Sequence, residues 1–340
     1  MDTNKIILNW YDLEKRSLPW REPNKNNIDV YKVWISEIML QQTTVTAVIP
    51  YFKKFISRFP NINILAESNI EDVLTYWAGL GYYSRARNLH KCSKQIVEKF
   101  NGIFPNDIEI LIKLPGIGDY TASAICAIAY NQHKVALDVN VRRVITRINN
   151  KHNLCNTSIK KLAENILPLD RPGDFNEAIM DIGSKYCKSK FPKCSICPIN
   201  NICKTFRFNK SALTNFNTIK TSKNKITRYG NCYLIKKKDD NKFLFVRRPN
   251  KGLLGGMLSF PSSLWVLDKN DIPNDKLFED LIKHENIKDY IHHTFSHFNL
   301  ILNVYYIIVI NRVDIEGEWL DIGNARGQLP SLMKKVANLV

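Results

Sequence analysis

The stretch Leu114-Pro115-Gly116-Ile117-Gly118 decides the fold of the N-terminal part of the chain, because it joins two segments of helical periodicity, residues 107–113 and 119–130. Its glycines allow positive φ angles, and the turn leaves unpaired N–H groups at the start of the second helix. The helix dipole and these amides favour an anion. The turn is therefore interpreted as a helix–hairpin–helix, in which Gly116 and Gly118 grip a DNA phosphate. A plain interhelical turn is the alternative.

Two carboxyl side chains lie in settings that favour chemistry. Asp138 lies at the start of a basic helix about twenty residues after the turn, where it can equally be a simple N-cap. Asp119 is expected to cap the second helix of the hairpin, residues 119–130. Glu37 follows Trp34 by three residues and precedes Leu40 by three, which places a carboxyl on an apolar helical stripe. Burial there should raise the pKa of Glu37, whereas a surface position is disfavoured because the segment has no polar flank.

Four of the eight cysteines form one cluster with the spacing C-x6-C-x2-C-x5-C, and the other four are scattered singly. The clustered ones are Cys187, Cys194, Cys197 and Cys203. With no export signal visible, crowded thiols are better interpreted as metal ligands than as disulfides. Four cysteines at unequal spacing in one short segment favour a [4Fe–4S] cluster over zinc, because structural zinc sites usually use two C-x2-C pairs. Lys188, Lys190 and Lys193 lie in the loop between the first two ligands.

The 340 residues carry 49 Lys and Arg against 32 Asp and Glu, a formal charge of +17 that invites a polyanionic partner. Compositional drift toward Lys, Asn and Ile is the competing explanation. No segment has the length of a membrane span and no secretory signal is visible, so a bacterial cytoplasmic location with nucleoid association is expected.

Hydrophobic periodicity divides the chain in two. Helical periods run through residues 30–40, 45–59, 70–78 and 85–100, whereas a period of two begins after Arg228. Strand pairs are expected at 231–235 with 243–247 and at 291–297 with 300–310, and short helices at 276–283 and 331–339. The expected domains are an all-α region at 1–208, a basic linker at 209–227 and an α+β domain at 228–340. The linker is equally consistent with a solvated tether.

The order of hairpin, aspartate and four-cysteine loop resembles the helix–hairpin–helix DNA glycosylase superfamily, and within it the MutY family. Specific motifs carry the resemblance from about Trp10 to the C-terminus. They are Leu18-Pro19-Trp20-Arg21, Val33-Trp34-Ile35-Ser36-Glu37-Ile38-Met39-Leu40-Gln41-Gln42-Thr43, Gly79-Leu80-Gly81-Tyr82-Tyr83-Ser84-Arg85-Ala86-Arg87 and Phe175-Asn176-Glu177-Ala178-Ile179-Met180-Asp181.

The resemblance implies excision of adenine opposite 8-oxoguanine, or more slowly opposite G, from double-stranded DNA by a retaining mechanism. Glu37 would protonate N7 of the flipped adenine, and Asp138 would stabilise or trap the sugar cation. Tyr120 and Asn140 match positions beside the deoxyribose. Relatives that also cut the backbone carry a lysine where Tyr120 stands, so little or no lyase activity is expected.

The remaining matches concern binding. Trp20, Arg21 and Glu177 resemble the lining of the base pocket. Residues expected on DNA include wedge positions, groups near the lesion strand and basic side chains: Gln42, Thr43, Leu80, Tyr82, Arg85 and Lys190. For each residue alone, core packing or an ordinary surface contact is the alternative. The chain departs from the family at Val139, usually Gly, and at Asp119, often basic or Pro.

The C-terminal region resembles a Nudix fold through Leu253-Leu254-Gly255-Gly256-Met257-Leu258-Ser259-Phe260-Pro261 but lacks the acidic Nudix box, which disfavours a Mg²⁺-dependent nucleotide hydrolase. Phe295, Ser296 and His297 match the loop that recognises 8-oxoguanine; a strand-end turn is the alternative. Two rival functions are a thymine or oxidised-pyrimidine glycosylase and an inert damage-binding protein. A monomer is expected.

Overall fold

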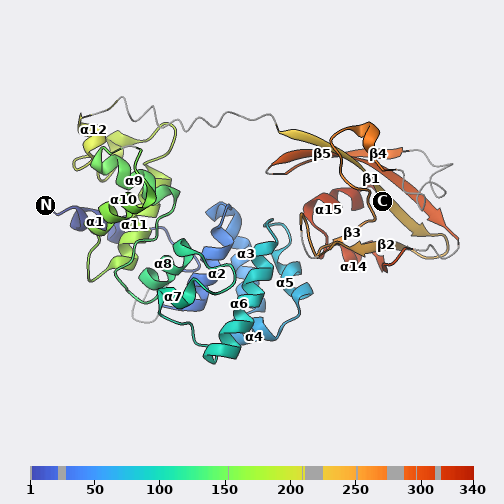
Figure 1. Cartoon of the computed structure of the whole chain (residues 1–340), viewed down its shortest axis with the longest axis horizontal. Coiled ribbons are helices and arrows are strands. Elements are labelled where there is room, and N and C mark those ends of the chain that lie inside the picture. Colours follow the sequence, from blue (N-terminus) through green and yellow to red (C-terminus); the bar gives the residue numbers. More distant parts are fainter. Residues whose placement is uncertain are drawn as a thin grey trace. The chain divides into compact units, whose positions relative to one another are not determined.

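The computed structural model describes residues 2–21, 28–151, 153–208, 210, 225–249, 252–273, 287–295, 297–310 and 315–340. The chain forms two compact units (Figure 1). One comprises Met1–Ser68 and Asn88–Lys220, and the other comprises Asn69–Arg87 and Thr221–Val340. Residues 69–87, expected in the N-terminal region, thus group with the C-terminal region. Most of the expected linker and the expected helix at 276–283 lie outside the described residues.

Helices build the first unit, as the periodicity predicts. They are α1 (Thr3–Glu14), α2 (Val30–Leu40), α3 (Val45–Arg58), α4 (Ile62–Glu67), α6 (Ser84–Phe100, whose first turn belongs to the second unit), α7 (Ile108–Leu111), α8 (Asp119–Ile128), α9 (Val139–Asn149), α10 (Asn156–Glu164), α11 (Pro172–Lys185), the 3₁₀ turn η2 (Cys194–Ile196) and α12 (Lys204–Phe208). Among the described helices, none combines the length and apolar character that crossing a bilayer requires.

Helix α11 lies at the centre of this unit. It begins with Pro172 at its first turn, a position where the missing N–H costs nothing, and it packs against α1, α8 and α9. Its apolar side chains, among them Ile179 and Ile182, join Ile7 of α1 and Val144 of α9 in one buried cluster. Because α11 is buried on most sides, its polar residues lie inside the protein, where they can line a site.

The second unit is built on a mixed sheet with the strand order β3-β2-β1-β5-β4, and β6 also pairs with β2. The strands are β1 (Ile226–Lys237), β2 (Lys242–Arg247), β3 (Leu258–Ser259), β4 (Ile287–Thr294), β5 (Phe298–Val309) and β6 (Glu318–Asp321). Both expected hairpins are present as antiparallel pairs, β1 with β2 and β4 with β5. The parallel pairing of β1 with β5, from Ile226 opposite Phe298 to Lys237 opposite Val309, was not predicted.

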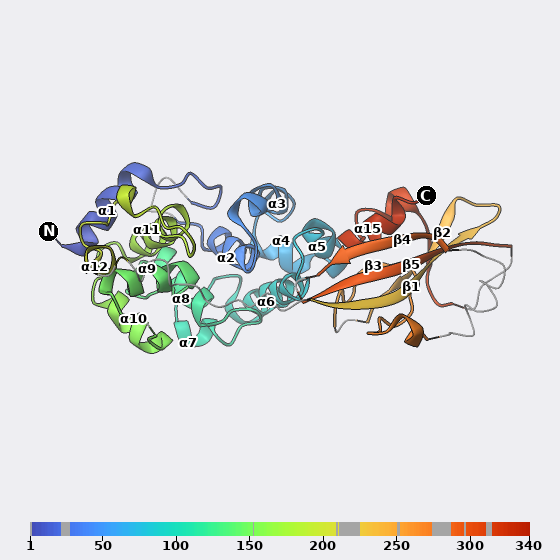
Figure 2. The same cartoon turned by 90° about the horizontal axis from the view of Figure 1, so that it is seen from above.

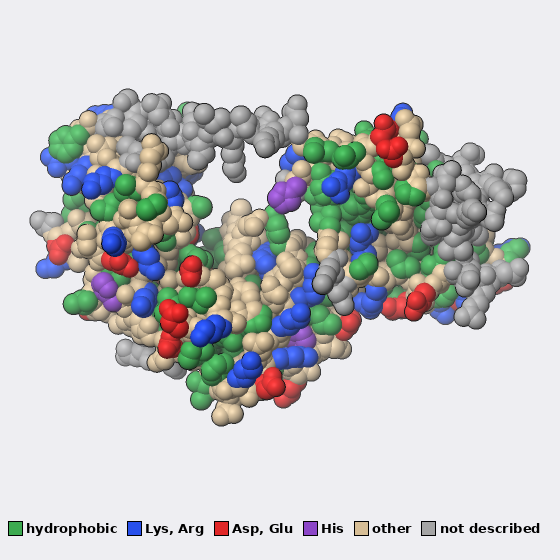
Figure 3. All heavy atoms as spheres, viewed as in Figure 1, with side chains coloured by type: hydrophobic (Ala, Val, Ile, Leu, Met, Phe, Trp, Pro, Cys, Tyr) green, Lys and Arg blue, Asp and Glu red, His purple; other side chains and the backbone are tan. Residues whose placement is uncertain are grey.

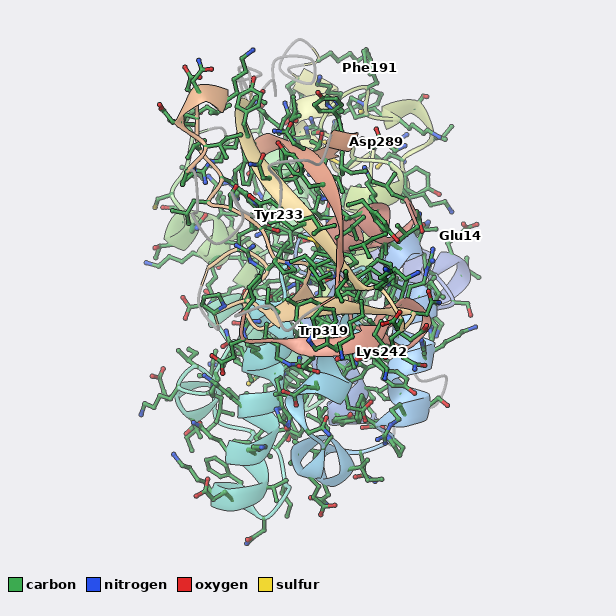
Figure 4. All side chains as sticks on the ribbon, turned by 90° about the vertical axis from the view of Figure 1, so that its right-hand side faces the viewer. Glu14, Phe191, Tyr233, Lys242, Asp289 and Trp319 are labelled. Carbon is green, nitrogen blue, oxygen red and sulfur yellow. The ribbon has the colours of Figure 1, made fainter. Side chains whose placement is uncertain are left out.

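Alternation along β1 gives this sheet two apolar faces. Cys232 and Leu234 contribute to a core shared with α15 (Ser331–Ala337), the helix that covers that face (Figure 2). Tyr233 and Ile235 point the other way and join a smaller cluster that Trp319 borders, and Figure 4 labels Tyr233 and Trp319. The unit also contains α5 (Ile70–Trp77) and α14 (Ile322–Ala325). The predicted α+β class is therefore confirmed.

Candidate active site and nucleic-acid interface

Helix α2 carries Glu37 into the interior of the first unit. Asp29 caps the helix by accepting hydrogen bonds from the backbone N–H groups of Tyr31 and Lys32, and residues 33–39 are all buried. Glu37 is 6% exposed, and its Oε2 has no hydrogen-bond partner among the described residues. The predicted apolar setting of this acid is confirmed.

This environment changes the acidity of Glu37. Burial raises the pKa of Glu37 to about 7, and the carboxylates of Asp138 and Glu177 act in the same direction, against the hydroxyl of Tyr120 and the charge of Arg21. Tyr120 lies in the first turn of α8 and is half-buried, and burial of its hydroxyl raises the pKa of that group well above its ordinary value. Glu37 is therefore poised to exchange a proton near neutral pH.

Asp138 is the N-cap of α9. Its Oδ1 accepts a 2.6 Å hydrogen bond from the Val141 N–H, and its Oδ2 accepts one of 2.8 Å from Asn140 Nδ2. Burial raises the pKa of Asp138, whereas these bonds and the charge of Arg143 stabilise the carboxylate. The N-cap and a chemical role are therefore compatible, because the Val141 N–H uses only Oδ1 and Asp138 also lines a pocket.

The side chain of Asn140 is fixed by contacts with Arg143 and with helix α11. Arg143 Nη2 donates to Asn140 Oδ1 at 2.7 Å and to the Gly183 carbonyl at 2.8 Å. A Cβ atom on Gly183 would lie 2.6 Å from the Cβ of Asn140, so the close approach of α11 to α9 requires glycine there. Arg143 Nε also donates to the carbonyl of Cys187. These contacts fix Asn140, and through it the second oxygen of Asp138.

A second polar group comes from α1, α11 and the segment between α1 and α2. Arg21 Nε donates to Glu177 Oε1 at 2.8 Å, and its Nη1 donates to Asp181 Oδ2 at 2.7 Å. The Tyr11 hydroxyl donates to Glu177 Oε2, and Arg16 Nε donates to Asp181 at 2.6 Å. Burial alone would raise the pKa of Asp181, but hydrogen bonds from the two arginines hold it below its usual range. Glu177 thus has a fixed orientation.

These side chains line one pocket of about 570 Å³. Every predicted catalytic and base-pocket residue contributes to its wall, together with two of the residues expected on DNA: Glu37, Asp138, Tyr120, Asn140, Trp20, Arg21, Glu177, Gln42 and Thr43. Val139 also lines it and is 74% exposed, so its branched side chain lies at the surface of the protein. Three carboxyl groups, a phenol and a guanidinium from these predicted residues therefore meet around a space large enough for a nucleoside.

Sequence reasoning missed Arg16, Tyr11 and Asp181 as part of this site. Asp181 lies one helical turn after Glu177, so both carboxyls share a face of α11, and two nearby arginines precede α2. The sequence therefore contained a signal for this ion-pair cluster: two acids four residues apart on one helix, and two arginines, Arg16 and Arg21, before α2. Pairing across more than 150 residues, however, is set by the packing of α1 on α11.

The structure of the hairpin turn confirms that Gly116 needs to be glycine, and it shows a different N-cap residue for α8 from the one expected. Gly116 has φ +80°, and a Cβ there would come within 2.9 Å of the Asn88 Cβ. Gly118 has φ −102° and open space around it, and it is the N-cap of α8. The expectation that Asp119 caps α8 is wrong, because Asp119 is already the first helical residue. The open space at Gly118 leaves the backbone accessible to a ligand.

The four clustered cysteines line one small cavity with Arg147 and Tyr186. Arg147 is 1% exposed, and its Nη1 donates to Cys187 Sγ at 3.3 Å and to the Lys188 carbonyl at 2.7 Å. No group of three or more potential ligands in the described part of the chain converges on a single-ion site. Burial, with the neighbouring thiols, raises the pKa of Cys197 to about 12, so four thiolates there require added positive charge.

The cysteine loop is exposed between Cys187 and Cys194. Lys188, Lys190 and Lys193 are exposed, and Phe191 between them is 90% exposed with φ +51° (Figure 4). Lys and Arg side chains also occur over the visible face of each unit (Figure 3). The loop therefore offers cations to an anionic partner.

Two residues expected to enter DNA share an uncommon backbone conformation. Gln42 has φ +56° and Tyr82 has φ +49°, values that L side chains seldom adopt. Gln42 is exposed and Tyr82 is 36% exposed, whereas Leu80 is buried. Arg85, also expected on DNA, is 8% exposed and donates to protein carbonyls instead. Strain of this kind is concentrated at functional sites.

The predicted recognition loop lies in the second unit. Phe295 stacks on Trp265 with ring centroids 5.9 Å apart and also packs on Phe298, while His297 is exposed. Gly230 allows this arrangement, since a Cβ there would meet the Trp265 ring at 2.7 Å. Ser296 lies outside the described residues. Phe295 is thus an anchor at the base of the loop.

Two family models match the chain. Residues 35–183 match the HhH-GPD superfamily of base excision DNA repair proteins, and residues 232–339 match the NUDIX domain. The chain is 42% identical over 318 residues to an adenine DNA glycosylase of Buchnera aphidicola subsp. Baizongia pistaciae, covering 92% of this chain and 87% of that one. It is 33% identical over 358 residues to the human adenine DNA glycosylase, covering 88% and 65%.

Solved structures are similar to the chain as well. A thermostable thymine-DNA glycosylase aligns with TM-score 0.55 and 26% identity over 60% of this chain and 94% of that one. An endonuclease III in a non-covalent DNA complex aligns with TM-score 0.51 and 21% identity, covering 60% and 93%, a likeness of fold alone.

Proposed function

Because the chain belongs to the MutY family of adenine DNA glycosylases, we propose that it excises adenine opposite 8-oxoguanine, and more slowly opposite G, from duplex DNA. The observation that carries the proposal is the pocket in which Glu37, with its raised pKa, faces the same space as Asp138. Glycosidic cleavage needs one protonated and one ionised carboxyl, and these two environments supply that difference.

Glu37 acts as the general acid. Its protonated carboxyl donates to N7 of the adenine, so that the base leaves as a neutral group when the bond between C1′ and N9 breaks. The Tyr120 hydroxyl orients this carboxyl from α8. Arg21, Glu177 and Trp20 form the wall against which the base lies.

Asp138 stabilises the positive charge that develops on the sugar. Its carboxylate is held by the Val141 N–H and by Asn140, so it needs no reorganisation when the bond breaks. Water then adds at C1′ on the face that the base has left, with retention, and the Glu37 carboxylate takes up the proton that this water releases.

Tyr120 makes the enzyme monofunctional. Burial raises the pKa of the Tyr120 phenol, and a phenol has no amine with which to form a Schiff base. Relatives that cleave the backbone form this Schiff base through a lysine at the same position. Borohydride trapping on adenine:8-oxoguanine DNA should give little covalent adduct. Strong trapping would contradict the assignment.

The four cysteines hold a [4Fe–4S] cluster. Their convergence on one cavity and the need of buried thiolates for positive charge both fit a polynuclear group. When bound, the cluster supplies iron–thiolate cross-links that fix the basic loop carrying Lys190. Purified protein should be brown, with broad visible absorption and about four iron atoms per chain. Stoichiometric zinc without iron would refute this.

Binding and extrusion use both units. The Gly116–Gly118 turn and Lys190 contact phosphates, Gln42 and Tyr82 act as wedges, and Thr43 and Leu80 lie close to the lesion strand. Ser296 and His297 recognise 8-oxoguanine in the opposite strand, on the anchor that Phe295 provides. His297→Ala should therefore reduce the preference for 8-oxoguanine over G without changing cleavage of adenine opposite G.

One experiment separates this function from its rivals. Duplexes with adenine:8-oxoguanine, adenine:G, T:G and thymine glycol are incubated with the protein, and abasic sites are cleaved with alkali. Cleavage of the two adenine substrates is expected, with 8-oxoguanine preferred. Activity on the pyrimidine substrates alone would favour the thymine glycosylase, and tight binding without cleavage would favour an inert damage-binding protein.

A further inference from the structure

The loop that presents Tyr82 combines three left-handed backbone positions. Gly79 has φ +115°, Gly81 has φ +72° and Tyr82 has φ +49°. Glycine adopts such angles freely, but tyrosine does not, so surrounding contacts must hold Tyr82 in this conformation. The Trp77 Nε1 donates to the Gly81 carbonyl at 3.2 Å, and the Arg85 N–H donates to the Tyr82 carbonyl at 2.9 Å.

The side chain of Arg85 holds this loop from inside. Its Nη2 donates to the carbonyls of Leu80 at 3.3 Å and of Gly81 at 3.2 Å. Its guanidinium lies over two rings, 5.3 Å from the centroid of Trp77 and 5.6 Å from that of Tyr82. Trp77 is fully buried, so the arginine connects the exposed Tyr82 ring to the core.

We propose that Arg85 is a positioning residue that keeps Tyr82 rigid while the adenine is extruded, and not a phosphate contact. The inference rests on the proposed function, because it takes Tyr82 as the wedge. A side chain 8% exposed, whose Nη2 donates to two carbonyls and whose Nε is buried, is poorly placed to neutralise a phosphate. Burial lowers the pKa of Arg85 to about 10, which still leaves it cationic at neutral pH.

The physical role follows from the cost of extrusion. Taking a base out of the duplex costs a few kcal/mol, which a wedge offsets only if it stays in place as the stack opens. Without Arg85, Tyr82 can relax to an ordinary φ angle and turn away. Extrusion should then fail, while proton transfer from Glu37 in the other unit is unaffected.

Arg85→Met tests the proposal, since methionine keeps an unbranched stem and removes the guanidinium. With 2-aminopurine as the target base, the fluorescence rise on binding should be largely lost. Single-turnover cleavage of adenine opposite 8-oxoguanine should fall by about 10- to 100-fold, and cleavage of adenine opposite an abasic-site analogue, where extrusion is easy, by less than about threefold. Equal losses on both substrates would overturn the proposal.

Three comparisons exclude simpler explanations. Lys91→Met removes an exposed cation from the same helix α6 and should leave extrusion unchanged. If Arg85 contacts a phosphate, Arg85→Met should reduce the salt-dependence slope by about 1; an unchanged slope is expected. In a Tyr82→Ser background, Arg85→Met should have no further effect on extrusion, and an additive effect would overturn the proposal.

Misfolding and failure of the proposed function are distinguishable from failure of this inference. Arg85→Lys keeps the charge but loses the planar fork, and it should remain folded by thermal unfolding yet extrude as poorly as Arg85→Met. Full rescue by lysine would overturn the requirement for the guanidinium group of Arg85. A wild-type protein that brightens 2-aminopurine but cleaves no adenine would contradict the proposed function while leaving the Arg85 comparison intact.

Discussion

Glu37 concentrates the conflict between stability and chemistry in one side chain. Its carboxyl is buried beside two other carboxyls, and the Oε2 atom has no partner among the described residues, an arrangement that no stability argument favours. The same arrangement keeps a proton available near neutral pH. The residue is therefore best understood as an acid maintained at the expense of folding.

The single-turnover rate should depend on the protonation of Glu37. Because its pKa is raised to about 7, the protonated fraction, and with it the rate, should fall about tenfold per pH unit above that value. Glu37→Gln should lower the rate by about 10²- to 10⁴-fold and abolish this alkaline limb. An alkaline limb of the same midpoint in Glu37→Gln would exclude Glu37 as its source.

Folding stability should respond to the same titration. A carboxyl whose pKa is higher in the folded than in the unfolded protein contributes stability below its unfolded pKa and loses it as pH rises through 7. Glu37→Gln should thus match wild type near pH 4.5 and become more stable by up to about 3 kcal/mol at pH 8. Denaturant unfolding at both pH values measures this, and a constant difference would contradict it.

At the scale of elements, the two glycines of the hairpin have separable purposes. Gly116 adopts a positive φ angle against Asn88, whereas Gly118 has an ordinary φ angle and open space where a Cβ would lie. Gly116 therefore shapes the turn, and Gly118 leaves room for a phosphate beside the start of α8.

Paired alanine substitutions should separate these purposes. Gly116→Ala should lower the free energy of unfolding by about 1–3 kcal/mol through strain and crowding. Gly118→Ala should leave stability almost unchanged but weaken DNA binding by about 3- to 10-fold, because the new Cβ fills the approach to the backbone N–H groups. Thermal unfolding and binding to uncleavable DNA check both, and equal loss of binding in two folded variants would refute the distinction.

Sequence reasoning reached the elements whose signal is local. The helix of Glu37, the N-cap at Asp138 and both β hairpins follow from periodicity and capping within a few residues. It did not reach the parallel pairing of β1 with β5, since alternation specifies a face but not a distant partner. Arg85 was expected on DNA as a cation that follows Tyr82, whereas the structure shows it buried among the loop carbonyls and the rings of Trp77 and Tyr82.

For the whole molecule, net charge overstates the cations available to DNA. Arg85, Arg142, Arg143 and Arg147 all donate to protein carbonyls or side chains, so the formal +17 counts cations committed inside the fold. The exposed lysines of the cysteine loop are the better candidates for phosphate contacts. Affinity should depend on that smaller set.

The salt dependence of binding measures this set directly. With Glu37→Gln to prevent cleavage, log K plotted against log salt should be linear with a slope equivalent to roughly 5–10 phosphates. Combined Lys188→Gln, Lys190→Gln and Lys193→Gln should reduce the slope by about one for each phosphate that these lysines neutralise, and Arg142→Gln should not. An unchanged slope in the triple variant would remove the loop from the interface.

The close approach of Gly183 to Asn140 enlarges the mutational target of this protein beyond its pocket. Any side chain at position 183 would push Asn140, and with it the second oxygen of Asp138, although Gly183 itself is not among the residues that line the pocket. In a forward genetic selection for strains with raised spontaneous mutation, Gly183 substitutions should therefore be recovered beside Glu37 and Asp138 changes. Such alleles would produce normal amounts of an inactive protein. A steric defect outside the pocket would therefore give the same mutator phenotype as the loss of a catalytic residue.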